Sequence, residues 1–169
     1  MRRSLLVLIA LAAALLAGQR LRWWLSSDAT RIRWRLEEME EGFNRARLGP
    51  CLRAVAKDWR DESSGLERAL LAEILRALFF SERDPDSGRF RFRVELERET
   101  LSIELAAGER GRARVQAVAH FAALERGQWT PTWSVRVRAD LAWEDGLGWQ
   151  VHRSEHETLE SDGRLRRER

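Results

Sequence analysis

The chain has 169 residues, the length of one domain with a short appendage. Hydrophobic residues make up 44% and charged residues 34% of it, which excludes a disordered chain, because such chains lack the apolar side chains for a core. Its 30 basic and 27 acidic residues alternate along the sequence, and this pattern argues against a nucleic-acid partner, which would favour positive charge gathered on one face.

A basic start and an apolar run occupy residues 1–25. Arg2 and Arg3 precede the sequence LLVLIALAAALLA at positions 5–17, the pattern of a secretory signal. A cleavage site is missing, because Leu15 stands where a small residue is required two positions before Ala17. We therefore expect an N-terminal hydrophobic helix that acts as an uncleaved signal anchor, with a cleaved signal peptide as the alternative.

The end of this segment favours a membrane interface. Arg20 can extend its charge to the lipid headgroups, and Trp23 and Trp24 are residues that prefer this layer. We expect a single-pass membrane protein whose domain lies on the extracytoplasmic side, or a secreted protein if the signal is cleaved. Basic residues flank the apolar run on both sides, so the orientation stays open.

Three helices are predicted after the anchor. The first begins at the cap residues 26–28, and its apolar side chains recur every three or four residues, at Ile32, Leu36, Met39, Phe43 and Ala46. A short second helix is predicted for CLRAVAKDW, residues 51–59. The third, residues 66–80, follows a cap at Ser63 or Ser64, and its wide apolar face predicts thorough burial.

From residue 89 the apolar residues alternate with charged ones, which predicts β-strands. The alternation covers 90–96 and 101–105, with a bulge or turn at 98–100, and then 112–125, 133–143 and 149–159. We expect four or five antiparallel strands in an α+β domain of residues 26–160. The polar, basic residues 161–169 are predicted to be a disordered tail.

The last hairpin contains two tryptophans, two histidines and several carboxylates within residues 143–159. Asp145 and Gly146 supply the turn, because glycine adopts positive φ without strain. Trp143 and Trp149 are predicted to pack across the two strands, so their positions need no catalytic explanation.

The order of these elements resembles the nuclear transport factor 2-like and SnoaL-like cone superfamily. The residues that match are LEEMEEGF at 36–43, Trp143-Glu144-Asp145-Gly146, and Trp149-Gln150-Val151, within a resemblance over residues 28–159. It implies a cystatin-like cone, in which three N-terminal helices pack on a strongly curved antiparallel sheet.

The resemblance also implies a pocket inside the cone. The side chains predicted to point inward are Phe43, Trp59, Phe121, Val135, Val137, Leu141 and Trp149. Such a lining can bind an apolar ligand but cannot transfer protons. Enzymes of the superfamily place acids, histidines or tyrosines there, and this chain contains no tyrosine. We therefore expect no catalytic residue and no cofactor.

Strand parity places His120, Asp140 and His152 on the sheet face away from the helices. Imidazole and carboxylate groups suit zinc, but no local spacing brings these three residues together, so we predict no metal site. His156 is interpreted as part of a solvated strand end. Asp58 and Asp61, near the predicted second helix, could approach the mouth of the cone, but a carboxylate at the end of a helix is usually solvated.

Two functions remain open. The leading hypothesis is a non-catalytic, membrane-anchored interaction or assembly module that binds a second copy of itself or a protein partner. The alternative is a SnoaL-like small-molecule binding protein or enzyme that holds an apolar ligand in the cone.

Overall fold

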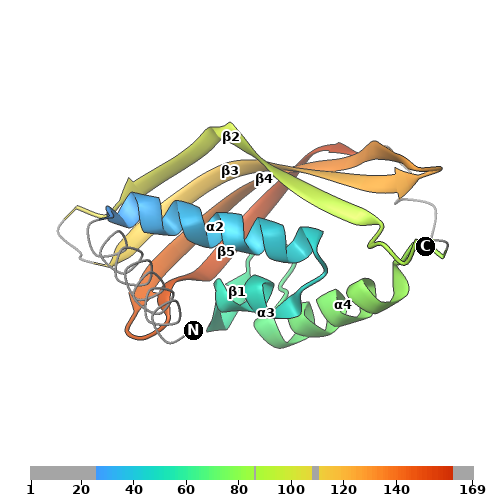
Figure 1. The fold of residues 1–169 in the computed structure, drawn as a ribbon. Helices are drawn as coiled ribbons and strands as arrows, with labels where there is room; N and C mark the ends of the chain where they lie inside the picture. The colour runs from blue at the N-terminus through green and yellow to red at the C-terminus, as the bar shows by residue number, and fades with distance from the viewer. Residues whose placement is uncertain (1–25, 86, 108–110, 162–169) are drawn as a thin grey trace, which may run out of the picture.

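A computed structural model describes residues 26–85, 87–107 and 111–161. Its helices are α2 (Asp28–Asn44), α3 (Leu48–Arg53) and α4 (Arg68–Ser81). Its strands are β1 (Val55–Asp61), β2 (Phe92–Leu105), β3 (Arg112–Glu125), β4 (Gln128–Glu144) and β5 (Gly148–Ser161). They form one curved sheet in the order β1-β5-β4-β3-β2 with the helices against one face, so the predicted α+β arrangement is confirmed (Figure 1).

The predicted anchor helix, residues 1–25 with Arg20, Trp23 and Trp24, lies outside the described residues, as does the predicted tail beyond Ser161. Within the described ranges, no helix has both the length and the apolar character needed to cross a membrane.

The first helix forms as its pattern predicts. Ser27 caps α2, because its side chain accepts a hydrogen bond from the backbone N–H of Thr30 at 3.2 Å. Ile32 and Leu36 are buried in the core under the sheet. The charged side of α2 is tied to the edge of the sheet, since Arg98 on β2 donates to Glu37 and Glu40.

The prediction of a second helix over residues 51–59 is wrong in its second half. The helix α3 ends at Arg53, and the chain continues as β1, which pairs in parallel with β5. Val55 lies beside Val151 in this pairing, and Trp59 is buried in the same core. Tertiary pairing therefore overrides a weak local helical spacing. The sheet is consequently mixed rather than wholly antiparallel.

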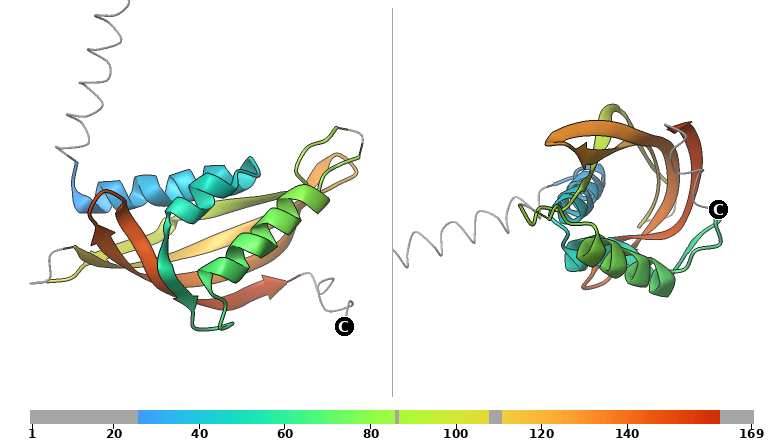
Figure 2. Two further views of the ribbon diagram at one scale, coloured as in Figure 1. Left: turned by 90° about the horizontal axis from the view of Figure 1, so that it is seen from below. Right: turned by 90° about the vertical axis from the view of Figure 1, so that its right-hand side faces the viewer.

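The apolar face of α4 is only partly buried, which corrects the expectation for residues 66–80. Leu75 and Phe79 are buried, whereas Leu70, Ile74 and Phe80 are 50%, 46% and 85% exposed. The helix lies along one side of the domain, against α3 and β1 (Figure 2). Its apolar stripe is therefore wider than the surface that covers it. Its N-cap is Glu67, not Ser63 or Ser64.

Two irregularities in the sheet decide which residues face the helices. In β2 the register shifts between Glu97 and Ser102, at the predicted bulge. A second shift lies between β4 and β5 at Asp140/Leu141, where the sequence gives no signal. Leu141 pairs with Val151, whereas Val137 pairs with His156. The bulge thus turns His156 toward the same face as the core residue Val151.

Candidate functional site

The predicted apolar pocket is divided between two parts of the core. Trp59, Leu141 and Trp149 pack with the buried side of α2, and Trp149 is only 2% exposed. The other four, Phe43, Phe121, Val135 and Val137, form a second cluster toward the opposite end of the sheet. Only Val135 of these four is fully buried. The part of the cone around Trp149 is therefore filled, whereas the side chains of Phe43, Phe121 and Val137 in the other part are partly accessible.

A buried carboxylate with four donors lies on this inner face. Asp61 ends β1 and is 5% exposed. Its Oδ1 accepts from the backbone N–H of Ser64 at 2.9 Å and from the Ser64 hydroxyl at 2.8 Å. Its Oδ2 accepts from the Ser154 hydroxyl at 2.9 Å and lies 3.3 Å from Nδ1 of His156. The loop after β1 is thereby fastened to β5.

Hydrogen bonding keeps Asp61 ionised. Burial by itself raises the pKa of this carboxyl group, because the charged form loses water. The bonds from Ser64, Ser154 and His156 stabilise the charged form and outweigh burial, so the pKa lies below its ordinary value. Asp61 is therefore a fixed negative charge at neutral pH.

His156 is held in place through both its backbone and its imidazole ring. The Ser63 hydroxyl donates to the His156 carbonyl at 3.0 Å and accepts from the His156 N–H at 2.8 Å. The indole ring of Trp133 meets the imidazole edge to face at 6.3 Å, and Phe121 stacks on Trp133 at 5.0 Å. His156, Trp133 and Phe121 are all partly exposed.

This arrangement resembles the orienting half of an acid/base pair. A carboxylate beside Nδ1 fixes the ring and leaves Nε2 to act on another group. The interpretation of His156 as a solvated strand end is wrong, because the bulge near Asp140 reverses the parity of β5. The one available sequence signal was the alternation of Ser154, His156 and Thr158, the three polar residues that share the inner face.

The three weak metal candidates are on the outer side but do not come together. His120 lies 3.4 Å from Glu97 and 2.9 Å from the Ser134 hydroxyl. Asp140 pairs with Arg114 on β3. Arg114 is six residues from His120 along this strand, so the two positions are about 20 Å apart. His152 lies 3.0 Å from Asp58 and 3.2 Å from Glu144. Within the described residues, no group of three or more histidine, cysteine or acidic side chains could hold a metal ion.

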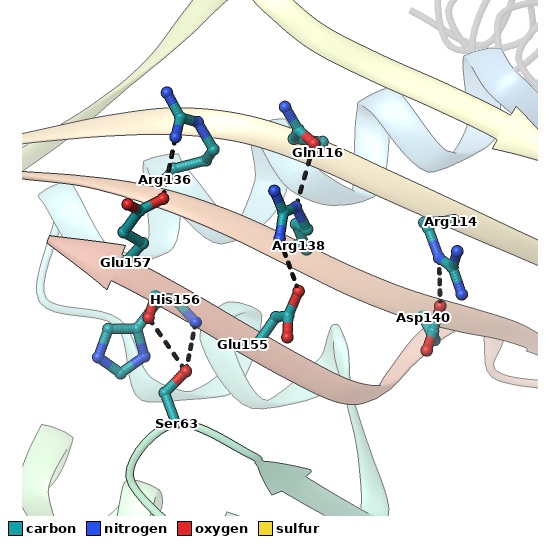
Figure 3. Close-up of polar contacts among 9 residues, drawn as sticks. All are labelled: Ser63, Arg114, Gln116, Arg136, Arg138, Asp140, Glu155, His156 and Glu157. Atoms are coloured by element: carbon teal, nitrogen blue, oxygen red, sulfur yellow. Dashed lines mark hydrogen bonds and ion pairs between the residues drawn. The ribbon is translucent and has the colours of Figure 1, made fainter. Parts of the chain in front are cut away.

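The outer face of β3, β4 and β5 carries rows of paired charges (Figure 3). The pairs are Arg136–Glu157 at 2.9 Å, Arg138–Glu155 at 3.1 Å and Arg114–Asp140 at 3.0 Å, and Arg138 also donates to Gln116 at 3.3 Å. Between 36% and 68% of each charged side chain is exposed. A hydrogen bond from Arg114 to Asp140 raises the pKa of that guanidinium above its usual value. The face is polar, ordered and mixed in sign.

Solved structures share this fold. A nuclear transport factor 2-like protein with a cystatin-like fold from Novosphingobium aromaticivorans is 16% identical, with a TM-score of 0.61 over 85% of this chain and 88% of that one. A Mycobacterium tuberculosis protein of unknown function is 14% identical, with a TM-score of 0.63 over 80% and 79%. A ketosteroid isomerase-like protein from Erwinia carotovora atroseptica is 15% identical, with a TM-score of 0.56 over 80% and 99%.

No protein-family model and no curated protein matches the sequence. The structural similarities confirm the predicted fold, the cystatin-like cone of the nuclear transport factor 2-like proteins. At such low identity they establish the fold alone, because this fold carries many functions.

Proposed function

We propose that this chain is a non-catalytic interaction module, held at the extracytoplasmic side of a membrane by residues 1–25, that pairs with a second copy through the outer face of its sheet. The observation that carries the pairing is the set of charge rows on β3, β4 and β5. The attachment is supported by the basic start and apolar run of the sequence.

A face of mixed charge suits two-fold association. In a symmetric dimer the same patch meets itself, so each arginine must find an acceptor in an identical surface. A face of one sign would repel its copy, whereas rows of arginine beside rows of glutamate can be complementary. This face contains a hollow of about 500 Å³, lined in part by Arg114, Arg138 and Glu155. Side chains of a partner can fill this hollow.

Charge reversal tests the pairing. We expect the full chain in mild detergent to sediment as a dimer, and the double variant Arg136→Glu/Arg138→Glu to weaken association at least about a hundredfold, because like charges would then face each other. Adding Glu155→Arg and Glu157→Arg to the same chain should restore the dimer. Arg45→Glu, at the residue that follows the last turn of α2, is the control and should leave the sedimenting mass unchanged.

A wild-type chain that sediments as a monomer at all concentrations would contradict the dimer. Equal weakening by Arg45→Glu would show that net charge, and not this face, controls association.

A second candidate function is supported by the Asp61–His156 pair. An oriented imidazole beside the partly exposed rings of Trp133 and Phe121 offers one polar anchor in an aromatic setting, the usual composition of a small-molecule site. A planar aromatic alcohol could stack on these rings and bond to the Nε2 atom. This is the SnoaL-like alternative, a binding protein or enzyme that uses the open part of the cone.

Calorimetric titration with 2-naphthol tests this candidate. We expect binding, and we expect His156→Ala to weaken it about tenfold, the usual effect of losing one hydrogen bond in a site. His120→Ala removes an equivalent ring from the outer face and should have no effect. Absence of binding, or equal losses in the two variants, would eliminate the candidate.

A further inference from the structure

A second cleft lies at the far edge of the sheet, outside both the cone interior and the charged outer face. It has a volume of about 630 Å³ and is formed by the end of α2, the segment after α4, β2 and the first residues of β4. Its volume falls in the range of about 300–1,000 Å³ that small-molecule sites occupy.

The side chain of Asn44, which lines this cleft, covers the edge of the sheet at one residue. β2 is one of the two edge strands of the sheet, and Asn44 at the end of α2 occupies the place of a neighbouring strand. The Asn44 amide accepts from the Val94 N–H at 2.7 Å and donates to the Val94 carbonyl at 2.8 Å. A peptide strand cannot add to the edge at this point, because both backbone groups of Val94 are already bonded. A small ligand therefore suits the cleft better than an extended peptide.

The lining has a clear excess of positive charge. Two glutamates, Glu40 and Glu95, stand against five arginines, which are Arg45, Arg83, Arg89, Arg93 and Arg98. Three of the five pair with carboxylates: Arg45 with Glu41, Arg93 with Glu95, and Arg98 with Glu37 and Glu40.

Arg83 and Arg89 differ from these three. Arg83 donates to the carbonyls of Phe79 and Gly88, each at 3.1 Å, so it is fixed in place while its charge is not neutralised by a described carboxylate. The side chain of Arg89 makes no ion pair or hydrogen bond with any described residue, although the Arg89 backbone N–H donates to the Ser87 hydroxyl at 3.4 Å. Guanidinium groups bind phosphate oxygens through two parallel N–H donors, so Arg83 and Arg89 suit an anionic group.

An aromatic ring borders the same cleft. Trp129 is 41% exposed, and the guanidinium of Arg93 lies 5.2 Å from its ring centroid. An arginine that already stacks on one side of the indole helps to hold the ring in position. The accessible part of this ring can stack with a planar ligand group.

We propose that this cleft binds a small molecule with a phosphate group and a planar aromatic ring, with the phosphate at Arg83 and Arg89 and the ring against Trp129. This site is independent of the sheet face and of the Asp61–His156 pair, so its test does not depend on either proposal above.

Titration calorimetry on the full chain in mild detergent can test the site with adenosine monophosphate as the probe and adenosine as the uncharged comparison. We expect the phosphorylated probe to bind and adenosine to bind at least about tenfold more weakly, because charge-assisted bonds to phosphate are lost. Arg89→Glu and Trp129→Ala should each weaken the binding of adenosine monophosphate about tenfold or more. Both side chains are exposed, and unchanged thermal unfolding would verify that the variants fold.

Arg60→Glu is the matched control, since it makes the same charge change on an exposed position of β1. It should leave the affinity unchanged. The proposal is overturned if adenosine monophosphate does not bind, if adenosine binds equally well, or if Arg60→Glu weakens binding as much as Arg89→Glu does.

Discussion

Replacing Phe79 with alanine is expected to lower the free energy of unfolding by about 3–5 kcal/mol, whereas the same change at the adjacent Phe80 should alter it by less than about 0.5 kcal/mol. Phe79 is 5% exposed and meets the rings of Phe43 and Phe90 edge to face, at 5.7 Å and 5.1 Å. Its removal leaves a cavity among aromatic rings. Phe80 is 85% exposed, so its ring transfers little apolar surface from water on folding.

Urea denaturation followed by circular dichroism measures both variants against the wild type. The two phenylalanines are neighbours on one helix, so helix propensity changes equally and only burial differs. A large loss at Phe80 would show that α4 is covered by a second copy or a partner in solution. A small loss at Phe79 would contradict the packing of this ring against Phe43 and Phe90.

Local signals were sufficient where the contact partners are close in sequence. The cap at Ser27 and the spacing of Ile32 and Leu36 define α2 without any information from the sheet. Trp143 and Trp149 flank a turn, and the structure pairs them directly with ring centroids 6.1 Å apart. Turn chemistry and a period of two determine such a pair, so it could be predicted.

Pairing between segments that are far apart in the chain could not be predicted from the sequence. The residues of β1 are too few to display a strand pattern of their own, and they become a strand because β5, almost one hundred positions later, supplies the hydrogen bonds. The exposed side of α4 has the same cause. A helical period shows which side chains share a face, but not how much neighbouring surface exists to cover that face.

The candidate site depends on the same long-range effects. Asp61 and His156 are 95 positions apart and meet only because β1 joins β5 in parallel and a bulge turns His156 inward. Neither the parallel pairing nor that bulge leaves a local pattern. Local motifs therefore pointed to the tryptophan hairpin. Asp61 was expected near the mouth of the cone as a solvated carboxylate, and this expectation is wrong, because the loop after β1 and the strand β5 bury it to 5% exposure.

Substituting Asp61 with asparagine is expected to lower the free energy of unfolding by about 2–4 kcal/mol at pH 7. The carboxylate accepts from Ser64, Ser154 and His156, and an amide nitrogen in place of one oxygen would leave donors without an acceptor. Asp58→Asn is the control. The Asp58 side chain is 76% exposed, so its charge is screened by water and its loss should cost little.

The loss caused by Asp61→Asn should depend on pH in a defined direction. The pKa of Asp61 in the folded chain lies below its ordinary value of 3.8, so the ionised form contributes stability above that value. This contribution disappears as the pH falls through the folded pKa, since the folded carboxylate then takes up its proton as well. Urea denaturation at pH 7, 5 and 3 should show a difference in the free energy of unfolding between wild type and variant that is constant from pH 7 to 5 and smaller at pH 3.

If this difference stays constant to pH 3, the hydrogen bonds do not depend on the charge of Asp61. The loop would then be held to β5 by shape and neutral hydrogen bonds, and Asp61 could not serve as the fixed charge that orients His156.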